Sequence, residues 1–223
     1  VDRRGIATVT INRAEVNNAY NGDMIQGFLS AFGQIAKDPQ ARVVVLRGKG
    51  KHFQAGADLK WIMSLKASDW EANLAVSQAT TDAVRGLNEF SKPTIALIHG
   101  GCFGGGVGIA SSCDIVIASE DAFFAITEAK WGLMAAPIYP QLIARLGVAN
   151  TRRYSLTCER FNAQKALEIG LVDEVCATGK LDETAAPLID QLLDCPPNAL
   201  AESKASILEC AGLIIDDARA ADL

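Results

Sequence analysis

The stretch that most constrains the fold is residues 92–118, KPTIALIHGGCFGGGVGIASSCDIVIA. An apolar run at 94–98 is typical of a buried strand, and a second apolar run follows at 115–118. Between the two runs lie a glycine pair, a glycine triplet at 104–106 and a series of small residues. This pattern predicts a strand, a glycine turn, a helix and a second strand.

The glycine triplet leaves backbone N–H groups uncovered at the start of the expected helix. The helix dipole is positive at that end, so such donors suit an anion or a developing oxyanion. A lone glycine triplet more often reflects close packing of a small-residue helix. The functional interpretation therefore needs a second site of the same kind.

A second small-residue corner, Ala55-Gly56-Ala57, lies in the segment KGKHFQAGADLKWI at 49–62. Asp58 follows it, and a carboxylate in the first turn of a helix is favourable. Alone, this corner would be a tight turn with a helix cap. Together, the two corners predict that the backbone N–H groups of Ala57 and Gly105 converge on one carbonyl oxygen as an oxyanion hole.

The rest of the chain alternates between strand and helix patterns. Alternation and β-branched residues predict strands, and a 3.6-residue period predicts helices. Expected strands or extended segments lie at 5–11, 43–46, 122–126 and 171–175, and expected helices at 21–36, 68–90, 137–147, 150–157 and 162–169. Because the run VVVL at 43–46 is wholly apolar, we expect a sheet covered on both faces.

Two helix starts carry specific signals. Asn21 is the expected cap of the first helix, and Asn162 of a later one. The S-x-x-E pattern at 68–71 is a capping box that predicts a long helix to about residue 90. Its expected inward residues are Trp70, Leu74, Val84, Leu87 and Phe90.

Composition narrows the functional classes. The chain has 223 residues, is 49% hydrophobic and carries a formal net charge of −5, so neither nucleic acid nor an anionic membrane is the expected main partner. No apolar run approaches the roughly 20 residues of a membrane span. The six cysteines are scattered without a CxxC pair, which favours reduced thiols and a cytoplasmic location.

No metal site is expected, because His52 and His99 lie far apart in the sequence. We interpret both histidines as structural or surface residues. Cys102 lies near the predicted oxyanion hole, but its neighbours supply no base or positive charge to activate the thiol.

The chain resembles the enoyl-CoA hydratase (crotonase) superfamily. The motifs that carry the resemblance cover residues 5–175 almost continuously, in the family's order: NRAEVNNA, VVVLRGKGKHFQAGADLKWI, the stretch at 92–118, FFAITEAKWGL and TCERFNAQKALEIGLVDEV. The resemblance implies an α/β spiral of β-β-α repeats at 1–180. It also implies a C-terminal helical trimerisation segment, incomplete here, at 181–223, and a homotrimer or a dimer of trimers. The implied ligand is an acyl thioester of coenzyme A, with no cofactor besides.

The family's site residues can be placed on this sequence. Ala57 and Gly105 match the two oxyanion-hole donors, and Glu128 matches one of the two catalytic glutamates. The substrate-binding positions implied by the match are Ala55, Asp58, Leu59, Gly104, Gly108 and Trp131.

One position departs from the pattern, because the other glutamate is replaced by Gly108. The usual partner for holding the attacking water is therefore missing. Glu128, among apolar neighbours, is expected to have a raised pKa suited to proton transfer. We also expect Gly108 to leave space for a branched or bulkier acyl group.

The segments VGIASSCDIVIASE, TEAKWGL and TCERFNA are most similar to the bacterial methylglutaconyl-CoA and isohexenylglutaconyl-CoA hydratase branch. The expected activity is addition of water to a 3-branched enoyl-CoA. A feruloyl-CoA-type hydratase-lyase ranks second, and an isomerase or thioesterase stays open because a fold does not fix function. A non-catalytic scaffold or an RNA-binding protein is the alternative of another class, with the negative net charge against RNA.

Overall fold

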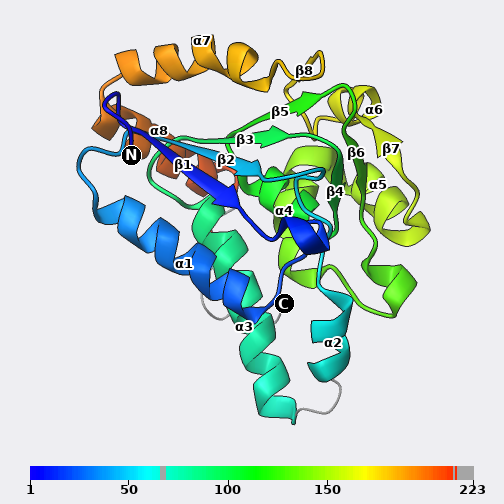
Figure 1. Cartoon of the computed structure of the whole chain (residues 1–223). Helices are drawn as coiled ribbons and strands as arrows, with labels where there is room; N and C mark the ends of the chain where they lie inside the picture. The colour runs from blue at the N-terminus through cyan, green and yellow to red at the C-terminus, as the bar shows by residue number, and fades with distance from the viewer. Residues whose placement is uncertain (66–68, 213, 215–223) are drawn as a thin grey trace.

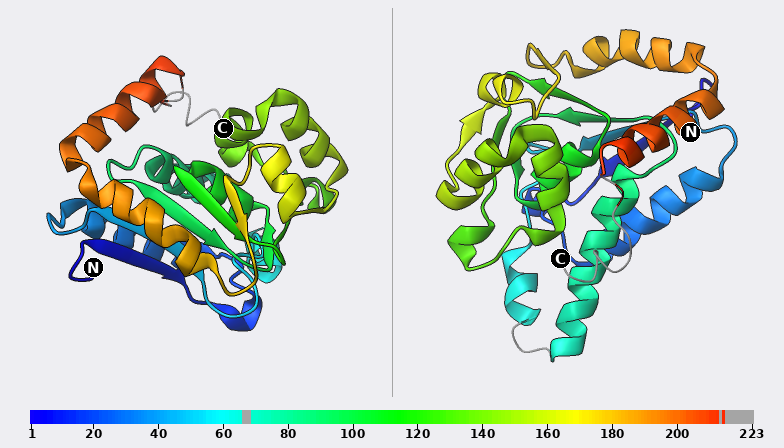
Figure 2. Two further views of the ribbon diagram at one scale, coloured as in Figure 1. Left: turned by 90° about the horizontal axis from the view of Figure 1, so that it is seen from above. Right: turned by 180° about the vertical axis from the view of Figure 1, so that it is seen from behind.

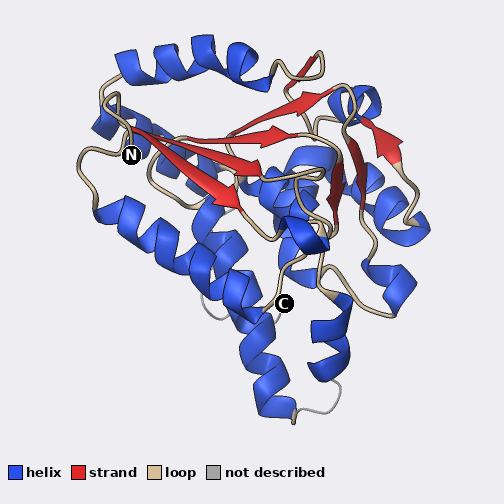
Figure 3. Ribbon diagram, viewed as in Figure 1, coloured by secondary structure: helices blue, strands red, loops and turns tan. Residues whose placement is uncertain are grey.

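The main sheet of the computed structural model is parallel and has five strands. The structure describes residues 1–65, 69–212 and 214. The strands β1 (Ile6–Ile11), β2 (Val43–Gly48), β3 (Thr94–Ile98), β5 (Ile115–Ser119) and β8 (Glu174–Cys176) lie in the order β1-β2-β3-β5-β8 (Figures 1 and 3). The expectation of an α/β fold is confirmed.

A smaller sheet holds three short strands, β4 (Gly101–Phe103), β6 (Phe123–Ala125) and β7 (Phe161–Asn162), in that order. Isolated bridges extend this pattern from Cys102 to Gln54, and pair Ala57 with Tyr20. Each repeat therefore sends one strand into the main sheet, one segment beside the small sheet, and then a helix. This arrangement is the spiral of β-β-α units that the resemblance implied.

Helices cover both faces of the main sheet. They comprise α1 (Gly22–Lys37), α2 (Leu59–Leu65), α3 (Trp70–Asn88), α4 (Gly105–Ser112), α5 (Tyr139–Thr157), α6 (Ala163–Glu168), α7 (Leu181–Asp194) and α8 (Pro197–Cys210), with short 3₁₀ turns at Ala14–Val16, Glu128–Trp131 and Ala136–Ile138. Figures 1 and 2 show α7 on one side of the sheet and α1, α3 and α4 on the other.

The alternation of side chains along each strand explains why the first four residues of β2, VVVL, are all apolar. Val44 and Leu46 pack into the larger core with Phe32 of α1 and Leu87 of α3. Val43 and Val45 face the opposite side, where Ala185 and Ile189 of α7 cover them. Successive residues of a strand point to opposite faces, so a strand covered on both sides must be apolar throughout.

The long helix α3 corrects part of the sequence prediction. Val84, Leu87 and Phe90 are buried as expected, but Trp70 is 77% exposed and Leu74 is 46% exposed. The reason is visible in Figure 1, where the first turns of α3 extend past the sheet beside α2. Asp69 is the N-cap and accepts a hydrogen bond from the N–H of Ala72 at 2.8 Å. Ser68 of the expected capping box lies outside the described residues.

The other cap predictions are confirmed, and one strand is displaced. Asn21 accepts a hydrogen bond from the N–H of Met24, and Asn162 accepts one from the N–H of Lys165. The strand expected at 171–175 begins only at Glu174. Leu171 and Val172 are buried in a turn instead, where both N–H groups donate to the carbonyl of Ala166.

None of the helices in the described ranges is long and apolar enough to cross a lipid bilayer.

Candidate active site

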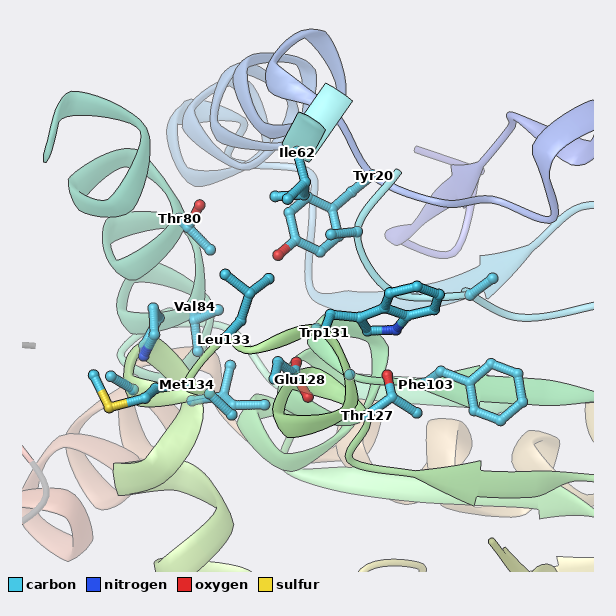
Figure 4. A pocket seen from close by; sticks show the side chains of 18 of the residues that line it. Tyr20, Ile62, Thr80, Val84, Phe103, Thr127, Glu128, Trp131, Leu133 and Met134 are labelled. Atoms are coloured by element: carbon cyan, nitrogen blue, oxygen red, sulfur yellow. The ribbon is translucent and has the colours of Figure 1, made fainter. Parts of the chain in front are cut away.

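A cavity of about 620 Å³ lies between the helical layer and the edge of the small sheet. Its apolar lining includes Met24 and Phe28 of α1, Ile62 of α2 and Val84 of α3. Residues of the segment that follows strand β6 also line it, among them Leu133 and Met134 (Figure 4). Most of the residues singled out from the sequence line this cavity.

The Ala57 corner is fixed by main-chain pairing with a residue from the preceding repeat. The N–H of Tyr20 donates to the carbonyl of Gly56 at 2.9 Å, and the N–H of Asp58 donates to the carbonyl of Tyr20 at 2.8 Å. Gly56 has a φ of +85°, a backbone conformation that is unfavourable for residues with a side chain. Ala57 lies between these two bonds, with its own N–H outside the pairing.

The Gly105 corner is the start of helix α4. Gly104 precedes it with φ +50° and ψ −118°, a conformation open essentially to glycine. Its N–H donates to the carbonyl of Ala125 at 2.9 Å, which ties the turn to strand β6. Gly105 is the first residue of α4, so its N–H has no acceptor within the helix.

The two corners are neighbours in space. The N–H of Phe103 donates to the carbonyl of Gln54 at 2.8 Å, and Gln54 in turn donates to the carbonyl of Gly101. A short ladder thus joins the two segments just before both corners. Ala57 and Gly105 line the same cavity, and among the hydrogen bonds of the described residues neither N–H has an acceptor.

Glu128 begins the 3₁₀ turn after strand β6 and lines the cavity. Its Oε2 atom is buried and has no hydrogen-bond partner among the described residues. Burial raises the pKa of this carboxyl group, while the nearby N–H groups of Glu128 and Thr127 oppose the shift. The raised pKa agrees with the sequence expectation and suits a group that accepts and returns a proton.

The Glu128 carboxylate packs directly against the glycine turn. A Cβ atom added to Gly104 would lie 2.7 Å from Oε1 of Glu128. Position 104 therefore requires glycine for two reasons. Its φ is positive, and a side chain there would collide with the Glu128 carboxylate. This contact places the carboxylate beside the Gly105 corner.

Tyr20 is a cavity residue that the sequence reasoning missed. Its ring edge is so close to Gly105 that a Cβ there would lie 2.6 Å from Cε1 of Tyr20. Burial and the negative charge of Glu128 raise the pKa of Tyr20 to about 12. A large aromatic residue next to the motif NRAEVNNA was the available signal, but only the folded chain brings it to this cavity.

The other implied positions divide into two groups. Ala55, Leu59, Gly104 and Trp131 line the cavity, as do Ala57, Gly105 and Glu128. Asp58 is outside the lining, and its carboxylate accepts hydrogen bonds from Arg13 at 3.2 Å and from the N–H of Lys60 at 3.1 Å. Its observed contacts are those of a helix-start residue in an ion pair.

Gly108 corrects the sequence prediction. It is buried, it is not part of the cavity lining, and a Cβ there would lie 2.2 Å from Cγ2 of Ile138. The expected extra space for a bulkier acyl group is therefore wrong, because Ile138 already fills it.

Other candidates have structural contacts. His52 accepts a hydrogen bond from the N–H of Gly101 through Nδ1 at 2.8 Å, and Nε2 of His99 lies 2.8 Å from the carbonyl oxygen of Gly50. Complete burial raises the pKa of Cys102 well above its ordinary value, so this thiol stays protonated. Within residues 1–65, 69–212 and 214, no group of three or more His, Cys, Asp or Glu residues could hold a metal ion.

The fold and cavity define the class of protein. A crystal structure of an enoyl-CoA hydratase from Shewanella pealeana has a TM-score of 0.91 and 36% identity, covering 96% of this chain and 80% of that chain. The paired sheets and β-β-α repeats are thus a crotonase fold.

The family model described as enoyl-CoA hydratase/isomerase matches residues 2–219. The chain therefore belongs to the enoyl-CoA hydratase/isomerase family, whose members are enoyl-CoA hydratases and related enzymes.

Relatives within this family carry different activities in their names. A hydroxycinnamoyl-CoA hydratase-lyase from Pseudomonas fluorescens is 31% identical over 221 residues, covering 92% of this chain and 76% of that protein. A peroxisomal Delta(3,5)-Delta(2,4)-dienoyl-CoA isomerase from Arabidopsis thaliana is 32% identical over 209 residues, covering 89% and 75% respectively. Family membership alone therefore does not decide between water addition and isomerisation, and the residues of the cavity must be considered.

Proposed function

We propose that this protein is an acyl-CoA hydratase that adds water across the double bond of a 2-enoyl-CoA. The observation that carries the proposal is the buried Glu128 carboxyl group beside the two small-residue corners. Among the described residues, one oxygen of this group has no hydrogen-bond partner, and the N–H groups of Ala57 and Gly105 have no acceptor. A polarised thioester and a proton carrier are what this reaction requires.

In the proposed reaction, the N–H groups of Ala57 and Gly105 bind the thioester carbonyl oxygen. Glu128 accepts a proton as water attacks the β-carbon, and the electron pair of the double bond moves to the thioester as an enolate. The two N–H groups stabilise the enolate oxygen, an interaction for which loss of one donor costs about 3–4 kcal/mol in comparable sites. Glu128 then returns the proton to the α-carbon.

The coenzyme A portion is assigned to the corner at Ala55, Ala57 and Leu59, with the neighbouring backbone of Asp58. Ala55, Ala57 and Leu59 line the cavity, as does Trp131. Coenzyme A belongs to the substrate in this proposal, and no separate cofactor is needed.

The acyl group is proposed to be a 3-branched glutaconyl-type chain with a second carboxylate. Gly108 does not support this assignment, because Ile138 fills the space beside it. The support comes from polar and charged residues in the cavity lining. Asn73, Ser77 and Thr80 of α3 line the cavity at helical spacing, and the cations of Lys130 and Arg160 also line it. A cavity with polar and cationic lining suits an acyl chain that ends in a charged group.

Isomerisation is the second candidate, and the presence of a single carboxylate favours it. Moving a double bond needs one group that removes and returns a proton, and it needs no water. A hydratase-lyase acting on an aromatic acyl group also fits the named relative. Thioester hydrolysis on the same scaffold would release free thiol.

One assay separates these reactions. Purified protein is incubated with a panel of straight, branched and carboxylated 2-enoyl-CoA and 3-enoyl-CoA thioesters. Hydration removes the conjugated thioester absorbance, isomerisation of a 3-enoyl-CoA creates it, and hydrolysis releases thiol. Glu128→Gln is expected to abolish turnover while acyl-CoA binding is retained. A variant that keeps most of its hydration would show that Glu128 is not the proton carrier.

Assembly as a homotrimer or a dimer of trimers, with 181–223 contributing to trimerisation, is part of the proposal. Exposed apolar residues on α5, namely Ile143, Val148 and Leu156, support an interface there. Light scattering on the purified protein tests it, and a stable monomer would contradict it. A cytoplasmic location is proposed because all six cysteines are free thiols.

RNA binding remains the alternative of another class. The net charge of −5 provides no general electrostatic attraction to phosphate groups. Salt-sensitive binding to RNA, together with no turnover on any thioester, would favour that alternative.

A further inference from the structure

Tyr20 is the residue at which the two corners of the site meet. Its backbone pairs with the residues on either side of Ala57, and its ring edge lies against Gly105. The ring also makes an edge contact with Trp61, with centroids 5.9 Å apart and planes at 66°. Both backbone and ring are therefore held in place, so the direction of the hydroxyl group is set by the fold.

The Tyr20 side chain and Glu128 both line this cavity. Figure 4 shows its hydroxyl directed away from the backbone, toward the part of the cavity where Leu133 and Glu128 lie. The two side chains approach neighbouring residues, because the Tyr20 ring lies against Gly105 and the Glu128 carboxylate against Gly104. Burial and the negative charge of Glu128 both raise the pKa of Tyr20. At neutral pH the phenol keeps its proton and can both donate and accept a hydrogen bond.

The hydration reaction needs a group of this kind. One carboxylate oxygen that takes a proton from water does not by itself fix the position of that water. Position 108 supplies no second carboxylate, because the residue there is a glycine, and Ile138 fills the space beside it.

Three other polar residues in the lining, Cys158, Lys130 and Arg160, are less suited. The Cys158 thiol is buried and donates to the carbonyl of Ser155 at 3.6 Å. Lys130 is exposed, and the Arg160 guanidinium lies over the rings of Phe103 and Phe123 at 5.2 and 5.5 Å.

We propose that the Tyr20 hydroxyl and the Glu128 carboxylate together hold the attacking water against the β-carbon, so that Tyr20 is a catalytic residue. This inference rests on the proposed hydratase function. In the step, the water oxygen bonds to the β-carbon and one water proton passes to Glu128. The electron pair of the double bond moves to the thioester oxygen, and the Glu128 proton ends on the α-carbon. Tyr20 keeps its own proton throughout.

The decisive variant is Tyr20→Phe, which keeps the ring against Gly105 and Trp61 and removes only the hydroxyl. We expect its hydration kcat to fall roughly 10- to 100-fold, the loss of one hydrogen bond in a charged arrangement. The KM, the Kd for a saturated acyl-CoA and the Tm should stay near wild-type values. The acid limb of the pH-rate profile should not move, because it belongs to Glu128.

Two further variants make the test specific. Tyr139→Phe removes a hydroxyl from a partly buried tyrosine outside the cavity lining and should keep full activity. Tyr20→Leu removes the ring as well, and should additionally weaken acyl-CoA binding and lower the Tm.

The outcomes are distinguishable. A Tyr20→Phe variant with the wild-type hydration rate would overturn the proposal, and so would one whose saturated acyl-CoA binding falls as much as its rate. If wild-type protein hydrates no thioester in the panel, the proposed function fails and the role of Tyr20 fails with it. If Glu128→Gln still hydrates, the protein is a hydratase but Glu128 is not the proton carrier, and the water site shared by Tyr20 and Glu128 is refuted. A selective loss of kcat in Tyr20→Phe, with binding and Tm retained, supports both.

Discussion

Replacing Glu128 with Gln should remove activity and at the same time stabilise the protein. The wild-type carboxyl group is buried, one of its oxygens has no partner in the described part of the chain, and burial raises its pKa. Glutamine has nearly the same shape and carries no charge. The nearby N–H groups of Glu128 and Thr127 can still bond to its oxygen, so the main change is loss of the desolvated charge.

The amide of glutamine is still polar at the unpartnered position, so the expected gain is the extra cost of burying a charge there instead of a neutral group, about 1–3 kcal/mol. For a chain of this size each kcal/mol shifts the Tm by roughly 2–4 °C. Thermal unfolding at neutral pH, followed by circular dichroism, should therefore show a higher Tm for Glu128→Gln. Glu202→Gln on exposed α8 is the matched control and should leave the Tm unchanged.

The stability difference should depend on pH in a defined direction. A raised pKa means that the folded chain holds the Glu128 proton at pH values where the unfolded chain has released it. Stability from this group is therefore lost as pH rises from the ordinary value of 4.5 through the raised value. The advantage of the variant is largest at neutral pH and disappears below pH 4.5. A variant less stable than wild type at pH 7, or a difference independent of pH, would refute this reasoning.

Three other substitutions test the packing around the site. Gly104→Ala should abolish activity and lower the Tm, because its Cβ would lie 2.7 Å from the Glu128 carboxylate at a φ of +50°; unchanged activity would contradict this geometry. Gly108→Ala should cost about 1–3 kcal/mol in denaturant unfolding, and adding Ile138→Ala should restore part of it if the two side chains compete for one space. Asn21→Ala should lower the free energy of unfolding by about 1 kcal/mol in the same measurement, because the α1 cap is lost. An unchanged free energy of unfolding would show that this cap does not stabilise the helix.

The predictable parts of this fold are those that local rules decide. Apolar runs gave the strands β2 and β3, and Asn21 and Asn162 cap helices as their side chains suggested. Trp70 and Leu74 were placed wrongly because helical period shows which residues share a face, but not how far the helix extends past the core.

The residues of the candidate site likewise fall into two groups, those found from local motifs and those that depend on contacts between distant segments. Glu128, Ala57 and Gly105 were found by the resemblance of their motifs, and the structure places them around one cavity. Their catalytic roles stay predictions. Tyr20 was missed and Gly108 was misjudged because both depend on contacts between distant segments, with Gly105 and with Ile138. No local pattern encodes which side chain fills a space left by a glycine.

The ladder that joins the two corners has a consequence for how this cavity changes over generations. The groups offered at Ala57 and Gly105 are peptide N–H groups, and only proline removes such a donor. Mutations can therefore change the side chains that line the cavity, including Tyr20 and the residues of α3, while the backbone N–H groups at Ala57 and Gly105 are retained. In such a molecule the two donors proposed to bind the thioester are inherited with the fold, while the side chains that would decide the reaction can change.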